Sequence, residues 1–164
     1  MSGVYEEILE GERLLRHPPG ERHEAICARL HAALTNAVAG SGTSRLMAVR
    51  SVVQFSPGTL LRPDLTLLTV ATGRPWLVVE VVSAGDHQPD TVVKKDCYER
   101  VRVPRLWVID PRYDNVEVYN GGPYGLALRS ILTQRDVLTD QLLPGFAFKI
   151  FELFGVPNPD AARR

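Results

Sequence analysis

The stretch Trp76-Leu77-Val78-Val79-Glu80-Val81-Val82 decides how this chain folds. Its apolar and β-branched composition is typical of a strand that is buried on both faces of a sheet. Glu80 is the charged residue within this run. A buried, unpaired charge costs several kcal/mol even after the protein relaxes. We therefore expect Glu80 to have a partner, which is a base, a proton or a metal ion; the alternative is a structural glutamate that is protonated or paired with an arginine.

A second carboxylate is expected opposite the first. The range Arg62–Leu68 also has the composition of a strand, with Pro63 near its start, where a missing N–H is tolerated. If the connecting hairpin is centred on Thr72, antiparallel register places Asp64 directly opposite Glu80. Residues so placed have Cβ atoms about 4.5–5.5 Å apart. The sequence therefore predicts a pair of neighbouring carboxylates on one face of the sheet.

This carboxylate pair predicts a metal site. Two like charges repel at such a distance unless a cation lies between them or one of them carries a proton. Oxygen ligands of this kind suit Mg²⁺ or Mn²⁺, so Asp64 and Glu80 are the expected metal ligands. For the same reason, we expect Glu80→Gln not to destabilise the protein in metal-free buffer, because the substitution removes one of two repelling charges.

A lysine is expected to reach this pair from the following helix. A helix is predicted from Asp90 to Arg102, with Asp90 as its N-cap. The apolar stripe of this helix consists of Val93, Cys97 and Val101. On a helical wheel Lys94 falls inside the buried sector, whereas Lys95 points away from it. The alternative for Lys94 is a side chain that snorkels at the edge of the core, but two nearby carboxylates favour a catalytic lysine.

The motifs named so far occur together with others and resemble a known family. These motifs are Pro63-Asp64, Glu80-Val81-Val82-Ser83, Asp90 with Lys94 and Tyr98, Val103–Pro111, Tyr5–Glu12 and Arg22-His23. They resemble the Uma-two family of predicted restriction endonucleases in the PD-(D/E)XK nuclease superfamily, and the resemblance extends to Leu142–Phe146. The third position of the Glu-X-Lys triplet is Val82 instead of lysine, so the resemblance implies that Lys94 has taken over the lysine role. A loop that usually reads Ser-Pro-Ser is Ser83-Ala84-Gly85 here.

The resemblance implies a fold and a set of supporting residues. The fold would be α+β, with a restriction-endonuclease-like central mixed β-sheet flanked by helices, and the substrate would be DNA. His23 would support the metal site or contact phosphate, although a satisfied histidine at a helix end is the alternative. Asp90 is favoured as an N-cap over a ligand, and Tyr98 either packs in the core or hydrogen-bonds into the site.

The element pattern agrees with an α+β fold. The expected elements are a hairpin over 4–16 turned at Glu10-Gly11, helices over 21–38 and 90–102, strands over 46–55, 62–68, 76–82, 106–110, 116–119 and 126–132, and a closing segment with Phe146, Phe148, Ile150 and Phe151 as packing residues. We expect one domain over residues 1–164, with a frayed tail from about residue 158.

Composition excludes some classes of protein. The net charge is zero, which argues against a protein that coats DNA non-specifically but not against a nuclease. Arg13, Arg16, Arg22 and Arg29 form either a local positive face or scattered solvated charge. Both cysteines, Cys27 and Cys97, are expected to be small buried hydrophobes, and no Cys/His spacing typical of zinc occurs. Neither a signal peptide nor a membrane span is expected, which favours the cytoplasm.

Three functions compete at this point. A metal-dependent phosphodiesterase acting on DNA is favoured, because Asp64, Glu80 and Lys94 are all present. The alternatives are a non-catalytic nuclease-fold module that binds nucleic acid or protein, and a two-carboxylate glycosidase, which would not require the lysine. The apolar range Phe146–Phe154 and the two strands of duplex DNA suggest a homodimer.

Overall fold

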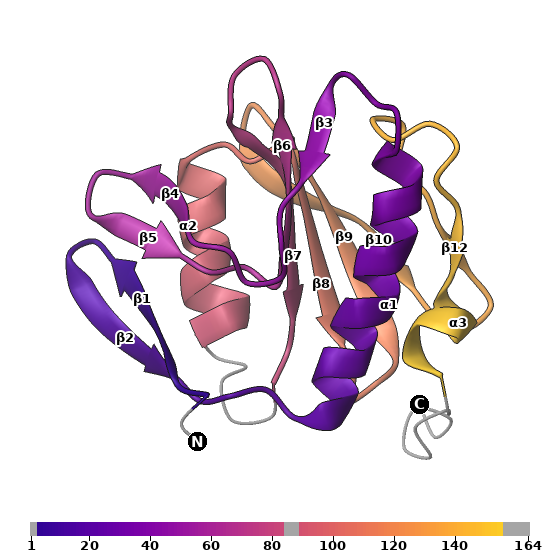
Figure 1. Ribbon diagram of the computed structural model, residues 1–164, viewed down its shortest axis with the longest axis horizontal. Coiled ribbons are helices and arrows are strands. Elements are labelled where there is room, and N and C mark those ends of the chain that lie inside the picture. Colours follow the sequence, from indigo (N-terminus) through magenta and orange to yellow (C-terminus); the bar gives the residue numbers. More distant parts are fainter. Residues whose placement is uncertain (1–2, 84–88, 156–164) are drawn as a thin grey trace.

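The centre of the molecule is a six-stranded sheet with the strand order β10-β9-β8-β7-β6-β3 (Figure 1). A computed structural model describes residues 3–83 and 89–155 of the chain. The strands are β3 (Ser44–Leu46), β6 (Leu65–Thr69), β7 (Pro75–Val81), β8 (Arg105–Asp110), β9 (Asn115–Gly122) and β10 (Gly125–Leu132). β7 and β8 run parallel, and the other neighbouring pairs are antiparallel. The sheet is therefore mixed, as expected.

Both faces of this sheet are covered (Figure 1). One face packs against α1 (Glu21–Val38), α3 (Ile150–Phe154) and the short pair β11 (Val137–Leu138) and β12 (Phe148–Lys149). The other face packs against the π-helical turn η1 (Pro89–Lys94), α2 (Lys95–Arg100) and a second sheet. That sheet has the order β2-β1-β5-β4, formed by β1 (Tyr5–Leu9), β2 (Glu12–Arg16), β4 (Val53–Ser56) and β5 (Thr59–Leu61). The α+β prediction is confirmed.

Strand β7 supplies side chains to both cores. Leu77, Val79 and Val81 belong to the core under α1, whereas Val78 and Val82 belong to the core under α2. Successive side chains of a strand point to opposite faces, so Glu80 lies on the same side as Val78 and Val82. The chain thus aims a carboxylate at the layer formed by α2 and the second sheet.

The expected hairpin register is confirmed next to the site. Strands β6 and β7 pair Leu65 with Val79 and Thr66 with Val78. A bulge near the turn pairs Leu68 with Pro75 instead of Trp76. The bulge lies at the far end of the hairpin, and Asp64, which directly precedes β6, accepts a hydrogen bond from the Val81 N–H at 2.8 Å.

The strand expected over 46–55 is wrong. The chain instead forms β3 and β4, which belong to different sheets. Between them the backbone leaves the sheet, with Arg50 in the left-handed region at a φ of 54°. The Arg50 N–H donates to the Asp64 carbonyl at 3.1 Å, which fixes this connection beside the site.

The helix expected over 90–102 is shorter and begins differently. Its first part is η1, and α2 ends at Arg100. Val93 is exposed, contrary to its expected place on the apolar stripe, whereas Cys97 is buried. A wheel at 3.6 residues per turn does not apply to a π-helical turn, whose hydrogen bonds span five residues. π-helical turns occur frequently at functional sites, and Lys94 lies where this turn meets α2.

Most of the apolar C-terminal range packs inside the protein. Phe146, Ile150, Leu153 and Phe154 are buried in the core under α1, but Phe151 is 55% exposed and does not pack as expected. The single-domain assignment stays a prediction, and its frayed tail lies outside the described residues. In the described ranges, no helix is both long enough and apolar enough to span a membrane.

Gly121 in β9 provides a test of the fold. A Cβ at this position would lie 2.7 Å from the Val103 carbonyl oxygen, whereas a Cβ at Gly42 would meet nothing within 4 Å. We expect Gly121→Ala to lower the free energy of unfolding by about 1–3 kcal/mol, because backbone has to move. Gly42→Ala is the control, and urea denaturation is the measurement. Equal stability of the two variants would contradict the close approach of β9 to this carbonyl.

Candidate active site

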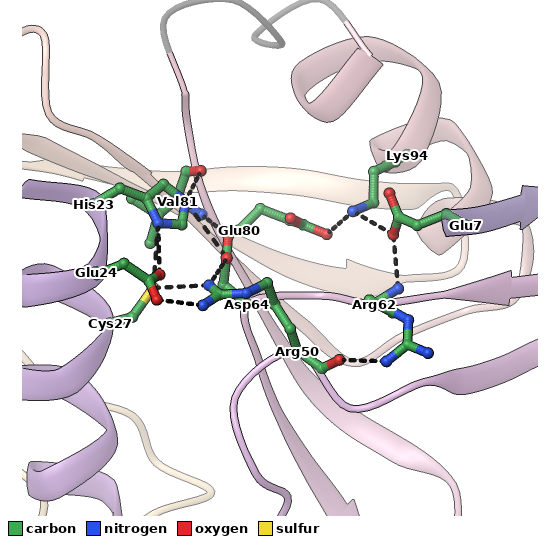
Figure 2. A network of polar contacts seen from close by, with 10 residues as sticks. All are labelled: Glu7, His23, Glu24, Cys27, Arg50, Arg62, Asp64, Glu80, Val81 and Lys94. Atoms are coloured by element: carbon green, nitrogen blue, oxygen red, sulfur yellow. Dashed lines mark hydrogen bonds and ion pairs between the residues drawn. The ribbon is translucent and has the colours of Figure 1, made fainter. Parts of the chain in front are cut away.

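The candidate site lies where β7 ends and β6 begins. Figure 2 shows Asp64 and Glu80 beside one another, with their carboxylates turned toward different cations. Side chains from α1 and from the connection before β4 reach Asp64, whereas Lys94 from η1 reaches Glu80 and also contacts Glu7 from β1. The central sheet thus brings together residues that are far apart in the sequence.

Asp64 is held by several donors. Its Oδ2 accepts a hydrogen bond from the Val81 N–H at 2.8 Å, and its Oδ1 lies 3.1 Å from Arg50 Nη1. The same Oδ1 lies 3.4 Å from His23 Nε2. Burial raises the pKa of Asp64, but the hydrogen bond and charge of His23 and the Val81 N–H outweigh this effect, so the pKa lies below its usual value. Asp64 is therefore a carboxylate at neutral pH.

His23 connects Asp64 to the backbone of β7. It lies in the first turn of α1, and its Nε2 is 3.0 Å from the Val81 carbonyl oxygen. Burial lowers the pKa of His23, but the contacts with Asp64 and with this carbonyl raise it above its usual value. His23 thus contacts Asp64 and is also a hydrogen-bonded histidine near the start of a helix, so its supporting role stays a prediction.

A ring of contacts surrounds Asp64 and His23. Arg50 Nη2 lies 2.6 Å from Glu24 Oε2, and Glu24 Oε1 lies 3.5 Å from His23 Nδ1. Because Arg50 also contacts Asp64, the four side chains form a closed circuit of polar contacts (Figure 2). Glu24 is about half exposed and lies on the solvent side of this circuit.

Glu80 is paired with Lys94. Lys94 Nζ lies 2.8 Å from Glu80 Oε1, and both side chains are almost fully buried. The Tyr98 hydroxyl donates a hydrogen bond to the same oxygen. Burial, the Glu80 charge and this hydrogen bond raise the pKa of Tyr98 far above its usual value, so Tyr98 stays a donor. The prediction that Lys94 points inward is therefore correct, and Tyr98 both packs in the core and reaches the site.

This pairing overturns one expectation from the sequence. Glu80→Gln was expected to leave stability unchanged in metal-free buffer, because the two carboxylates would otherwise repel. The structure instead gives Glu80 the Lys94 ammonium and gives Asp64 the Arg50 guanidinium. Removing one partner of a buried ion pair leaves an uncompensated charge, so we now expect Glu80→Gln to destabilise the protein.

Glu7 is a component of the site that was not assigned from the sequence. It is fully buried in β1, and its Oε2 lies 3.0 Å from Lys94 Nζ and accepts the Arg62 N–H at 2.6 Å. Its Oε1 accepts from Arg16 Nε at 2.8 Å. Burial raises the pKa of Glu7, but the charge of Lys94 and the hydrogen bonds from Arg62 and Arg16 hold it below its usual value. Lys94 is thus shared between two carboxylates.

The other proposed residues are accounted for as follows. Asp90 lies in η1, but its side chain is outside the described part of the chain, and so are Ala84 and Gly85. The four arginines considered as a positive face are dispersed. Arg16 is buried against Glu7, Arg13 pairs with Glu6 at the surface and Arg22 pairs with Asp114, while Arg29 donates to the Leu153 carbonyl.

Arg50 and Cys27 were also missed as neighbours of the site. Cys27 was expected only as a small buried hydrophobe, but its Sγ lies 3.7 Å from His23 Nδ1. His23, Cys27 and Asp64 offer ligand atoms that all lie within 4.8 Å of one another. Burial raises the pKa of Cys27, so it is a neutral thiol. A metal in this group would therefore be held mainly by Asp64 and His23, because a thiol is a poor ligand without deprotonation.

Glu7→Gln tests the shared lysine. We expect a loss of about 3–5 kcal/mol in the free energy of unfolding at neutral pH, because Arg16 and Lys94 lose a buried counter-charge. Glu6→Gln, in the neighbouring exposed pair, is the control and should change stability little. The measurement is urea denaturation at several pH values.

The pH dependence of this effect has a defined sign. A carboxylate with a lowered folded-state pKa contributes stability above its unfolded pKa and loses it as the pH falls through the folded value. The pKa of Glu7 is lowered. The difference in the free energy of unfolding between wild type and Glu7→Gln should therefore be largest at neutral pH and should shrink at acidic pH. A difference that grows on acidification would contradict this account.

Comparisons with known proteins agree with the fold. A family described as "Putative restriction endonuclease", Uma2, matches residues 3–151. A crystal structure of a putative nuclease belonging to DUF820 from Anabaena variabilis superposes with a TM-score of 0.76 at 16% identity, covering 91% of this chain and 89% of that one. This similarity shows the same fold.

Two further comparisons add little. A cryo-electron-microscopy structure of a DrdV–DNA complex matches with a TM-score of 0.44 at 20% identity, over 85% of this chain and 13% of that one, and it carries no structural argument. No curated protein matches the sequence. Because the family match covers most of the chain, this protein belongs to the Uma2 family, which is described as putative restriction endonucleases.

Proposed function

We propose that this protein is a metal-dependent endonuclease that hydrolyses phosphodiester bonds in DNA. The observation that carries the proposal is the arrangement of Asp64 and Glu80 at one end of adjacent strands, with Lys94 in contact with Glu80. Buried acidic and basic groups gathered at one site are typical of catalytic centres. The family match supports the same chemistry.

The residues at this site fit a divalent cation. Asp64 and Glu80 are the proposed ligands, and the Val81 carbonyl oxygen, which accepts a hydrogen bond from His23 Nε2, is a neighbouring oxygen atom. Carboxylate and carbonyl oxygens suit Mg²⁺ or Mn²⁺, and the contact between Asp64 and Arg50 indicates that this carboxylate accepts a cationic partner. When bound, such an ion supplies Lewis acidity toward the scissile phosphate and lowers the pKa of water.

The protein's own side chains would divide the remaining work. Lys94 is a buried cation, and its ammonium would stabilise negative charge that develops on the phosphate or orient the attacking water. Tyr98 and Glu7 hold Glu80 and Lys94 in place through the contacts described above. His23 holds the Asp64 carboxylate against the end of β7. Hydrolysis then adds water to phosphorus and releases one ester oxygen as an alcohol.

A second candidate is a non-catalytic module with the same fold. The observation that favours it is that both acidic ligands have protein cations beside them, Arg50 at Asp64 and Lys94 at Glu80. A site balanced in this way is stable without metal. Such a module would bind nucleic acid or protein without cleaving DNA. A DNA cleavage assay therefore separates the two candidates.

Cleavage of supercoiled plasmid tests the endonuclease proposal. Wild type should nick or linearise the plasmid when Mg²⁺ or Mn²⁺ is present and not when it is chelated. Asp64→Asn should abolish this activity, because a neutral amide is a poor ligand for a hard cation. Asp96→Asn is the matched control, since Asp96 is an exposed residue of α2, and its activity should equal that of wild type.

Lys94→Arg tests whether the position of the positive charge matters in addition to its presence. The substitution keeps the positive charge between Glu7 and Glu80, so the protein should remain folded, but the charge moves. Misplacement of a catalytic group by about 1 Å costs on the order of 10²-fold in rate, and we expect a loss of this size with Mn²⁺ binding retained. DNA binding without cleavage by wild type under every metal condition would instead favour the non-catalytic module.

We also propose that the enzyme acts as a homodimer in the cytoplasm. Two-fold symmetry suits the two strands of a duplex, and Phe151 leaves an apolar side chain on the surface of α3. Light scattering at micromolar concentration should give the mass of two chains, and Phe151→Ser should shift the mass toward one chain. A wild-type monomer would remove this proposal without affecting the catalytic one.

A further inference from the structure

Arg50 lies against Asp64 but has no role in the proposed chemistry. Its Nη1 is 3.1 Å from Asp64 Oδ1 and 4.0 Å from Cys27 Sγ, and its Nη2 is 2.6 Å from Glu24 Oε2. The guanidinium therefore occupies a position between groups that are potential metal ligands. Its Nη1 lies closer to Asp64 Oδ1 than His23 Nε2 does, at 3.1 Å against 3.4 Å.

The backbone fixes Arg50 in this place. The residue has a φ of 54°, in the left-handed region that residues other than glycine rarely adopt. Its N–H donates to the Asp64 carbonyl at 3.1 Å, and its own carbonyl accepts from Arg62 Nη1 at 3.2 Å. Hydrogen bonds at the N–H and at the carbonyl of Arg50 therefore hold its backbone in place, and the N–H bond holds it next to Asp64.

Each buried carboxylate at the site has a cationic partner without a metal ion. Glu7 contacts Arg16 and Lys94, Glu80 contacts Lys94, and Asp64 contacts Arg50, which also contacts the half-exposed Glu24. A divalent cation bound to Asp64 would add two positive charges within a few ångströms of the guanidinium. Like charges at such distances repel strongly in a partly buried site.

We propose that Arg50 is a tethered counter-ion that competes with the metal for Asp64. Its guanidinium neutralises Asp64 in the metal-free protein and leaves this carboxylate when a divalent cation binds. The inference rests on the proposed function, because it assumes that Asp64 is a metal ligand. It goes further by assigning to Arg50 the control of metal affinity.

Glu24 makes this displacement feasible. It holds Arg50 Nη2 on the solvent side of the site, so the guanidinium keeps an ionic partner after it leaves Asp64. The apparent affinity for the metal is reduced by the fraction of molecules in which Asp64 is free of the guanidinium. Removing the guanidinium should therefore strengthen metal binding, although it also removes a stabilising contact from the metal-free protein.

Isothermal titration of Mn²⁺ into the purified chain tests this inference. Arg50→Gln removes the positive charge. Arginine and glutamine both carry a Cβ, so the substitution should not change the conformational cost of the left-handed backbone at this position. We expect its Kd for Mn²⁺ to be at least about tenfold lower than that of wild type, which corresponds to about 1.4 kcal/mol. Thermal melting should show a lower midpoint in chelator and a larger rise with Mn²⁺.

Three other variants make the result specific. Arg13→Gln removes the same charge from an exposed pair with Glu6 and should leave the Kd unchanged. Asp64→Asn should abolish binding in both the wild-type and Arg50→Gln backgrounds. Arg50→Lys covers the case in which Arg50→Gln does not fold: a lysine cannot bridge Asp64 and Glu24 with a planar fork, so its Kd should also fall, by less than in the glutamine variant.

The outcomes separate this inference from the proposed function. If wild type binds Mn²⁺ through Asp64 and neither Arg50 variant binds more tightly, the counter-ion role is wrong and the metal site stands. If wild type does not bind but Arg50→Gln does, the inference is supported in its strongest form. If no variant binds Mn²⁺, both the inference and the proposed metal site fail.

Discussion

The Lys94 ammonium, shared between Glu7 and Glu80, is the interaction on which the rest of the site depends. All three side chains are almost completely buried, and they come from η1, β1 and β7. Burying two carboxylates without a cation would cost several kcal/mol for each ion. One ammonium therefore joins the small sheet, the central sheet and the helical layer, and it fixes Glu80 at the end of β7.

The two carboxylates opposite one another in the hairpin are neutralised in different ways. Glu80 is paired with Lys94 inside the protein, whereas Asp64 is paired with Arg50, which is 17% exposed and bound on its outer side by the half-exposed Glu24. Lys94 is buried, so ions from the solvent replace it slowly. Arg50 is partly exposed and has Glu24 as a second anion, so its guanidinium can move away from Asp64. The Asp64 side of the site is therefore where the charge balance can change, and the Lys94 side is where it is fixed.

The sequence predicted those parts of the site that depend on local pattern. Alternation along β7 and the turn after β6 predicted the pairing of Thr66 with Val78, because a two-strand register follows from turn position and the bulge at Leu68 lies at the far end of the hairpin. Glu7 and Arg50 were not predicted. Glu7 on β1 meets Lys94 on η1 across a long separation in sequence, and Arg50 falls within a predicted strand that contains no glycine or proline to mark its break. Such contacts are set by tertiary packing, which a local pattern does not encode.

Stability alone does not account for this many buried charges. A buried ion pair that is replaced by apolar side chains of similar volume is often as stable or more stable, so a chain selected only to fold has little reason to place Glu7, Glu80 and Lys94 in one interior. The same argument applies to Arg50, whose left-handed backbone adds a local conformational cost. Charge that contributes little to folding is explained by a ligand or a reaction that uses it. The buried carboxylates and cations therefore support the proposal of a site that binds a cation and a phosphate.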